Sequence, residues 1–224
     1  MGQNRVGDRR PIAAREPAVS RRTARWLAAR GVSANTISVA GMVAGLSAGS
    51  CFSLTAVWPE FARIFWLMGA ACVQLRLLAN MFDGMVAIET KTASPVGELF
   101  NEVPDRISDT ATLIGLGYSA GGIPVLGYWA AIAAIFTAYV RGVGKVAGAP
   151  QDFSGPMAKQ QRMFVATVVG VYLGVAPNSW QIHGIGSLDG GLSASALLLI
   201  IVGSIVTAGR RLLRTASILQ RGDV

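Results

Sequence analysis

The sequence predicts an all-α, polytopic membrane protein: a bundle of six transmembrane helices with an N-terminal amphipathic surface helix. Three observations predict this fold class. The composition is 52% hydrophobic and only 14% charged, and the mean hydropathy is +0.47, which is typical of membrane proteins. Long apolar stretches recur along the 224 residues, and arginines cluster near both ends. We therefore expect one compact bundle rather than two soluble domains.

The six spans follow from the length of the apolar stretches. A helix needs about 20 mostly apolar residues to cross the hydrocarbon core. The predicted spans are Asn35–Val57, Phe61–Ala87, Glu98–Tyr118, Ile123–Val146, Arg162–Val175 and Leu192–Ala208. Polar groups interrupt the start of the third span, and the fifth span is short. Together the spans form a membrane domain over residues 35–208.

Small residues in the first span predict close helix packing. Gly41, Gly45 and Gly49 follow one another at intervals of four residues. This spacing places them on one helix face, where the absence of side chains lets a neighbouring backbone approach in lipid.

The segments outside the membrane domain are strongly basic. Residues 1–34 are predicted to be a cytoplasmic tail with an interfacial helix, and residues 209–224 a second cytoplasmic tail. The first segment holds eight arginines, Arg5, Arg9, Arg10, Arg15, Arg21, Arg22, Arg25 and Arg30. Its part from Arg21 to Arg30, with Trp26 and Leu27, is expected to lie on an anionic membrane surface.

The distribution of basic residues predicts the orientation. With six spans, seventeen of the twenty Lys and Arg residues fall on the side of the two termini. Because cytoplasmic loops carry an excess of Lys and Arg, both termini are predicted to be cytoplasmic. A bacterial inner membrane is the simplest compartment for such a chain. Nucleic acid is not expected as a partner, because the basic charge is not spread over a folded surface.

An acidic run between the second and third spans is the most informative segment. Six of the chain's twelve acidic residues fall between Asn80 and Asp109. A charge in or beside hydrocarbon costs roughly 2.5–3.5 kcal/mol on insertion scales, so such groups usually mark an ion or substrate site. The polar faces of these two spans hold Arg76, Asn80, Asp83, Asn101, Glu102, Asp105 and Asp109.

Oxygen side chains on two facing helices suit a hard divalent cation, Mg2+ or Mn2+, better than zinc, which prefers His or Cys. The alternative is a salt-bridge network, in which Asp83 pairs with Arg76, and Asp105 with Arg106 or Lys91. A cation transporter or channel is a third interpretation, but the sequence shows neither broken helices nor an inverted repeat.

The spacing of the acidic run resembles the signature of the CDP-alcohol phosphotransferase family, D-x2-D-G-x2-A-R-x8-G-x3-D-x3-D. Five of its eight fixed positions match, at Asp83, Gly84, Ala87, Gly97 and Asp105. Asn80 and Asn101 stand at the first and third Asp positions, and Ile88 stands at the Arg position. The spacing is kept throughout.

This resemblance implies an integral-membrane transferase of phospholipid synthesis. It would move a phosphatidyl group from a CDP-linked lipid donor, such as CDP-diacylglycerol, to an alcohol acceptor and release CMP. A homodimer is expected. One or two Mg2+ or Mn2+ ions would be held by Asn80, Asp83, Asn101 and Asp105. The catalytic residues would be Asp105, as general base, and Asp109 as its substitute.

The small residues of the motif and a deeper arginine are expected at the donor. Gly84, Ala87 and Gly97 would let a phosphate-bearing ligand approach the backbone, which a salt bridge alone does not require. Arg76, one turn before Asn80, is the expected substitute for the cation missing at Ile88.

The departures from the signature lead to an alternative function. Asn is a neutral oxygen ligand, so Asn80 and Asn101 remove two negative charges from around the metal and favour weaker binding, or one ion instead of two. The alternative is a non-catalytic relative that binds CDP-lipid or acts as a membrane scaffold.

A second basic group lies at the predicted cytoplasmic ends of spans four and five. Arg141 and Lys145 end the fourth span, and Lys159 and Arg162 open the fifth. Two interpretations stay open for them. They set the topology, or they form an anion pocket for a phosphorylated acceptor or the donor head group.

Overall fold

The computed structural model describes residues 18–91, 95–177 and 190–221, and within these ranges every regular element is helical. The elements are α1 (Ala18–Ala29), α2 (Ala34–Val57), the short 3-10 helix η3 (Pro59–Phe61), α3 (Ala62–Glu89), α4 (Pro95–Gly117), α5 (Pro124–Val146), α6 (Lys159–Val175) and α7 (Leu192–Arg221). The first 17 residues of the predicted basic tail lie outside the described residues.

Each of the six predicted spans coincides with a long helix. Four elements are long and apolar enough to cross a membrane: α2, η3 with α3, α5 and α7. The other two are α6, which has 17 residues, and α4, whose first half carries the acidic residues of the motif. The described chain is thus all-helical with four candidate spans, and a count of six membrane crossings stays a prediction.

The largest departure from the predicted boundaries is at α7. This helix continues 13 residues beyond Ala208, to Arg221. The arginines after Ala208 therefore mark a change from apolar to basic sequence, but not the end of the helix.

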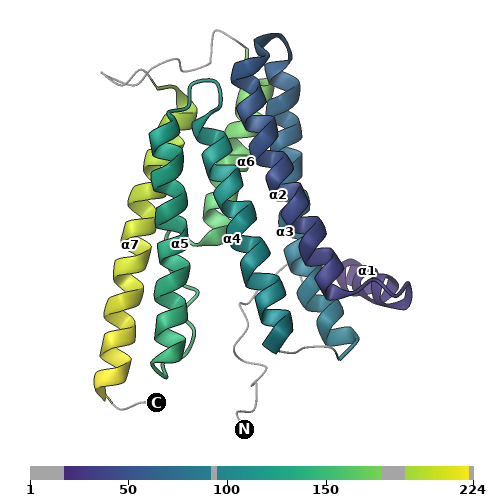
Figure 1. The fold of residues 1–224 in the computed structure, drawn as a ribbon, viewed down its shortest axis with the longest axis vertical. Helices are drawn as coiled ribbons and strands as arrows, with labels where there is room; N and C mark the ends of the chain where they lie inside the picture. Colours follow the sequence, from purple (N-terminus) through teal and green to yellow (C-terminus); the bar gives the residue numbers. More distant parts are fainter. Residues whose placement is uncertain (1–17, 92–94, 178–189, 222–224) are drawn as a thin grey trace.

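The long helices are arranged so that α2 packs between α3 and α4, while α5 packs between α4 and α7, and α6 packs against α3. Figure 1 shows this order. The C-terminal ends of α3, α5 and α7 and the start of α4 lie at the same, lower end of the bundle in that view. The acidic run, at the junction of α3 and α4, therefore lies toward this lower end.

The N-terminal helix α1 lies at an angle to the long helices, beside the lower part of α3 (Figure 1). It is fixed by Ala24, which is buried against Ile37 and Val86. Trp26 on its outer side is 53% exposed, and the guanidinium of Arg30 lies 4.8 Å from the centre of the Trp26 ring. Its predicted position on a membrane surface stays a prediction.

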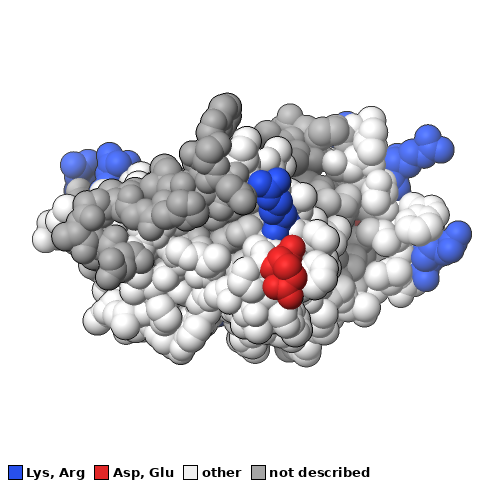
Figure 2. Space-filling model, turned by 90° about the horizontal axis from the view of Figure 1, so that it is seen from above, with Lys and Arg blue, Asp and Glu red and all other residues white. Residues whose placement is uncertain are grey.

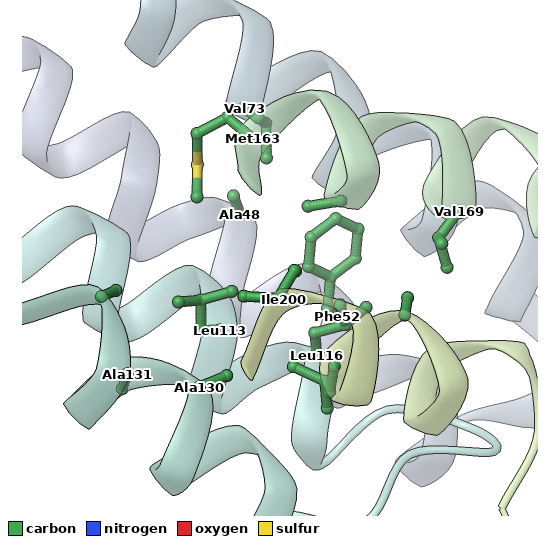
Figure 3. Close-up of a cluster of buried hydrophobic side chains, with 14 of the residues drawn as sticks. Ala48, Phe52, Val73, Leu113, Leu116, Ala130, Ala131, Met163, Val169 and Ile200 are labelled. Atoms are coloured by element: carbon green, nitrogen blue, oxygen red, sulfur yellow. The ribbon is translucent and has the colours of Figure 1, made fainter. Parts of the chain in front are cut away.

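The core joins all six long helices, α2 to α7 (Figure 3). Phe52 of α2 packs beside Trp66 of α3, with ring centroids 5.5 Å apart. Around this pair lie Val73 of α3, Leu113 and Leu116 of α4, Met163 of α6 and Ile200 of α7. Large apolar side chains such as Leu75, Phe164 and Ile205 are instead more than half exposed on the outside. Apolar groups outside and charged groups inside are the pattern expected of a bundle in lipid.

The glycines of α2 allow the close packing that their spacing predicts. A Cβ atom on Gly45 would lie 2.3 Å from Cβ of Ser108 in α4. One turn further on, a Cβ atom on Gly115 of α4 would lie 2.1 Å from the carbonyl oxygen of Gly49. The two backbones therefore meet directly at Gly49 and Gly115, where neither helix has a side chain, and approach closely at Gly45 and Ser108.

Among the residues that the structure describes, the upper end of the bundle carries little charge. Figure 2 looks onto this end and shows one basic and one acidic patch near the middle, with other basic groups at the outer edge. The charged side chains of η3 and the first turn of α3 are Glu60 and Arg63. The contrast with the lower end agrees with the predicted charge asymmetry, although the orientation in a membrane stays a prediction.

Candidate active site

The four residues at the Asp positions of the motif line one small pocket. Asn80 and Asp83 come from α3, and Asn101 and Asp105 come from α4. The pocket has a volume of about 10 Å³, which is room for roughly one water molecule or ion. Its remaining lining residues are Ser38, Gly41, Met42, Arg76 and Pro104. The helix α2 therefore supplies one wall of the pocket, to which Gly41 adds no side chain.

Asp83 is held in place from α2 and from its own helix. It is 4% exposed. The Ser38 hydroxyl donates a hydrogen bond to Asp83 Oδ2 at 2.8 Å, and the N–H of Gly84 donates to Oδ1 at 2.5 Å. Both carboxylate oxygens thus have a donor, which fixes the orientation of the side chain.

Arg76 joins the two helices of the motif. Its side chain is 1% exposed, and Nη2 lies 3.1 Å from Asp105 Oδ1 and 2.5 Å from Asp109 Oδ1. Its Nε donates to Ser108 Oγ at 3.0 Å, while Nη1 is buried without a hydrogen-bond partner. The alternative that pairs Arg76 with Asp83 is therefore wrong: the arginine reaches across to α4 instead of along its own helix.

Asp109 lies one turn deeper than Asp105, between two arginines. Arg162 Nη2 is 3.6 Å from Asp109 Oδ2, on the side opposite the oxygen that contacts Arg76. Arg162 is itself 1% exposed, and it donates to the carbonyl oxygen of Met157 at 2.8 Å and to Thr137 Oγ1 at 3.3 Å. Asp109 does not line the pocket.

Lys159 approaches the motif from the first turn of α6. Its ammonium group donates hydrogen bonds to Asn80 Oδ1 and to Asp105 Oδ2. Asp105 therefore contacts Lys159 with one oxygen and Arg76 with the other. Of the cations proposed for Asp105 in the salt-bridge alternative, Arg106 lies at 3.7 Å, and Lys91 is exposed beyond the end of α3.

The remaining basic candidates lie nearer the surface. Arg141 of α5 pairs with Glu102 at 2.6 Å and lies 5.0 Å from the centre of the Phe153 ring. Lys145 is exposed in the last turn of α5. The structure thus brings Lys159 and Arg162 into contact with the acidic residues of α4, places Arg141 on Glu102, and leaves Lys145 at the surface.

The small residues assigned to the donor lie beside the pocket without lining it. Gly84 and Gly97 are partly buried, as is Ala87, and none of them is part of the pocket wall. Asn101, in contrast, lines the pocket, and its side-chain oxygen is buried without a hydrogen-bond partner. This oxygen is therefore an acceptor that a ligand could use.

The side chains in this arrangement do not fit one or two divalent ions. Two of the four expected ligands are neutral amides, and Asp105 is already neutralised by Arg76 and Lys159. Over residues 18–91, 95–177 and 190–221, no three His, Cys, Asp or Glu side chains are grouped so that they could hold a metal ion. Mg2+ and Mn2+ prefer several carboxylate or other oxygen ligands without competing cations.

Sequence reasoning missed several parts of the site. Ser38 lies 45 positions before Asp83, and no spacing rule connects them. Arg211, one of the arginines beyond the predicted sixth span, is 6% exposed and donates to the carbonyl oxygens of Ser154 and Thr137, both at 2.9 Å. The only sequence signal for these two hydrogen bonds is that Arg211 closely follows the apolar stretch of the predicted sixth span, where the helix continues.

No protein-family model matches the chain. Among curated proteins, the inner membrane protein YnbA of Escherichia coli (strain K12) is 24% identical over 156 residues, which cover 70% of this chain and 75% of YnbA. Among solved structures, the phosphatidylinositol phosphate synthase PgsA1 of Mycobacterium tuberculosis with CDP-DAG bound superposes with a TM-score of 0.68 and 20% identity, covering 89% of this chain and 94% of that one. The chain has the PgsA1 fold.

Two further PgsA1 structures agree with this assignment of the fold. The complex with manganese and citrate gives a TM-score of 0.66 at 21% identity and covers 87% of each chain. The apo form gives a TM-score of 0.64 at 20% identity and covers 87% of this chain and 94% of PgsA1.

Proposed function

We propose that this protein is an integral-membrane transferase of phospholipid synthesis in a bacterial inner membrane, with both termini cytoplasmic. It moves a phosphatidyl or other substituted phosphate group from a CDP-linked lipid, such as CDP-diacylglycerol, to an alcohol acceptor, and CMP leaves. One observation carries the proposal. The residues at all four Asp positions of the motif line a single pocket, in a fold shared with a synthase whose structure contains CDP-DAG.

The reaction requires a base and a source of positive charge. The acceptor hydroxyl attacks the lipid-side phosphorus, a new P–O bond forms, and the P–O bond to CMP breaks. The hydroxyl proton passes to Asp105, which lines the pocket and is 14% exposed. Arg76 and Lys159, which hold this carboxylate, are positioned to stabilise negative charge on the donor phosphates. Asp109 orients Arg76 and Arg162 from one turn deeper.

The acceptor side is built from the basic residues of α5 and α6. Lys159 contacts Asp105 directly and is in reach of a phosphate at the pocket. Arg141, whose side chain is 16% exposed beside Glu102, contacts a phosphorylated acceptor. Lys145, at the surface, contributes to the same contact. Arg162 is completely enclosed and serves to position Asp109. Gly84, Ala87 and Gly97 give the donor access to the backbone, and the active unit is a homodimer.

The proposal is tested by measuring CMP release from CDP-diacylglycerol by the purified full chain over a panel of alcohols. The panel includes glycerol phosphate, inositol, inositol phosphate and serine, each with Mg2+, with Mn2+ and with EDTA. Release that depends on one acceptor supports the transferase. A hydrolysis of the donor without any acceptor, or no release with any of them, contradicts it.

A second candidate function is supported by the same pocket. Asp105 is ion-paired with both Lys159 and Arg76, and two of the expected carboxylates are amides. A non-catalytic protein that binds CDP-lipid would retain this arrangement. Saturable binding of CDP-diacylglycerol with no CMP release under any condition would favour this candidate.

A further inference from the structure

We propose that the ammonium group of Lys159 takes the place of a divalent cation in this pocket, so that the site is complete without a bound metal ion. This inference rests on the proposed function, but its test measures metal binding and does not require that function. It starts from a mismatch: a PgsA1 structure contains manganese, whereas the side chains of this chain do not fit such an ion.

The position of Lys159 carries the argument. Its ammonium contacts Asn80, at the first Asp position of the motif, and Asp105, at the last. These residues come from two different helices, α3 and α4, and the ammonium comes from a third, α6. A group that bridges ligand positions on facing helices is what a metal ion supplies in a site of this kind. Lys159 supplies that bridge with a charged group of the protein itself, through two hydrogen bonds.

The charges agree with this role. The carboxylates of α4 are already in contact with several cations: Asp105 contacts Arg76, Lys159 and Arg106, and Asp109 contacts Arg76 and Arg162. Carboxylates at positions 80 and 101 would have added two negative charges, which a divalent ion would balance. With Asn at both positions, a divalent ion would add two positive charges beside these cations without those carboxylates to balance them.

The first turn of α6 is anchored so that the ammonium cannot easily move away. The N–H of Met157 donates to Thr207 Oγ1 of α7 at 2.9 Å, and Arg162 binds the Met157 carbonyl oxygen. Gly155, with φ of 134°, lies where a Cβ atom would be 2.3 Å from Thr207 Cγ2. The loop before Lys159 is therefore held tightly on α7, and an incoming ion would have to displace a pre-positioned ammonium group.

The test is a titration of the purified full chain with Mn2+ alone, in detergent, with no donor or acceptor, in which electron paramagnetic resonance measures free Mn2+. The variants are Lys159→Met and, as a matched control, Lys91→Met, which removes an exposed lysine. Wild type and Lys91→Met are expected to bind Mn2+ weakly and alike. Lys159→Met is expected to bind it at least about tenfold more tightly, because one positive charge leaves the pocket. Adding Asn80→Asp to Lys159→Met should strengthen binding further.

Two results would overturn the inference. In the first, wild type binds one Mn2+ ion and loses it in Asp105→Asn, while Lys159→Met leaves the affinity unchanged. In the second, Asn80→Asp alone, with Lys159 retained, creates a tight Mn2+ site; this variant also provides the test if Lys159→Met does not fold. Because the titration needs no turnover, it succeeds or fails independently of the transferase. Equal release of CMP in EDTA and in Mg2+ would agree with the inference that the site needs no metal ion.

Discussion

Arg76 of α3 and Asp109 of α4 form an ion pair in which both side chains are almost fully buried, 1% and 3% exposed, with Nη2 2.5 Å from Oδ1. Two charges so far from water are tolerated only when they are paired with opposite charge. The same guanidinium nitrogen also contacts Asp105, the residue we propose as the base. The pair therefore links the packing of the two motif helices to the position of the reacting carboxylate.

Replacing Arg76 should destabilise the protein strongly. Arg76→Met leaves Asp109 buried with only the more distant Arg162, and removing one partner of a buried pair typically costs about 3–5 kcal/mol. The free energy of unfolding, measured by titrating a mild detergent with dodecyl sulfate, should fall by that amount. Arg210→Met, at an exposed arginine of α7, is the matched control and should change it little. Similar values for both variants would show that the buried network contributes little to stability.

The contact of α2 with α4 predicts a second effect on stability. In Gly115→Ala, the new methyl group would meet the backbone of Gly49, so the helices must separate and stability should fall by about 1–3 kcal/mol. The control is Gly142→Ala in α5, where no atom lies within 4 Å of the added Cβ. That change should be neutral or stabilise the helix by up to about 1 kcal/mol. If both variants melt at the wild-type temperature, the close approach of the two helices is not as tight as the structure shows.

Asp152, in the loop between α5 and α6, predicts a pH-dependent contribution. Partial burial disfavours its charged form, but hydrogen bonds from the Ser154 hydroxyl and N–H, together with Arg211 and Arg214, outweigh burial and hold the pKa of Asp152 below its ordinary value. A depressed folded-state pKa stabilises the protein at pH values above the unfolded pKa of about 3.9. The contribution is lost as the pH falls through the lower pKa of the folded state.

Asp152→Asn should therefore lower the melting temperature at pH 7 and pH 5, and the difference from wild type should shrink toward pH 3. In a Ser154→Ala background, where the hydroxyl donor is missing, the effect of Asp152→Asn at pH 7 should be smaller. A difference that stays constant from pH 7 to pH 3 would contradict the assigned pKa direction.

The sequence was sufficient to predict the helices and the four motif residues of the pocket, because both depend on short-range patterns. Apolar length set the bounds of α2 and α5 within one residue of the observed helices. The motif spacing placed Asn80, Asp83, Asn101 and Asp105 together, and these four do line one pocket. Helical periodicity alone brings such residues onto one face of each helix.

The partners of these residues could not be predicted, because they come from distant parts of the chain. Arg76 has Asp83 two turns away on its own helix, yet its guanidinium reaches Asp105 and Asp109 on α4. For Lys159 the sequence leaves open a topology-setting charge or an anion pocket, because it does not show how deeply the start of α6 enters the bundle. Long side chains choose their partners by the packing of the helices, which spacing along one helix does not contain.

The most direct test of the central claim compares CMP release by wild type, Asp105→Asn and Glu60→Gln in the same detergent preparation, with CDP-diacylglycerol and the acceptor panel. Glu60→Gln removes a carboxylate at the opposite end of the bundle. Wild type and Glu60→Gln should release CMP with one acceptor, while Asp105→Asn should release none, although it still elutes as a folded protein and binds the donor. Unchanged release by Asp105→Asn would contradict the assignment of the base, and donor binding without release by wild type would contradict the transferase itself.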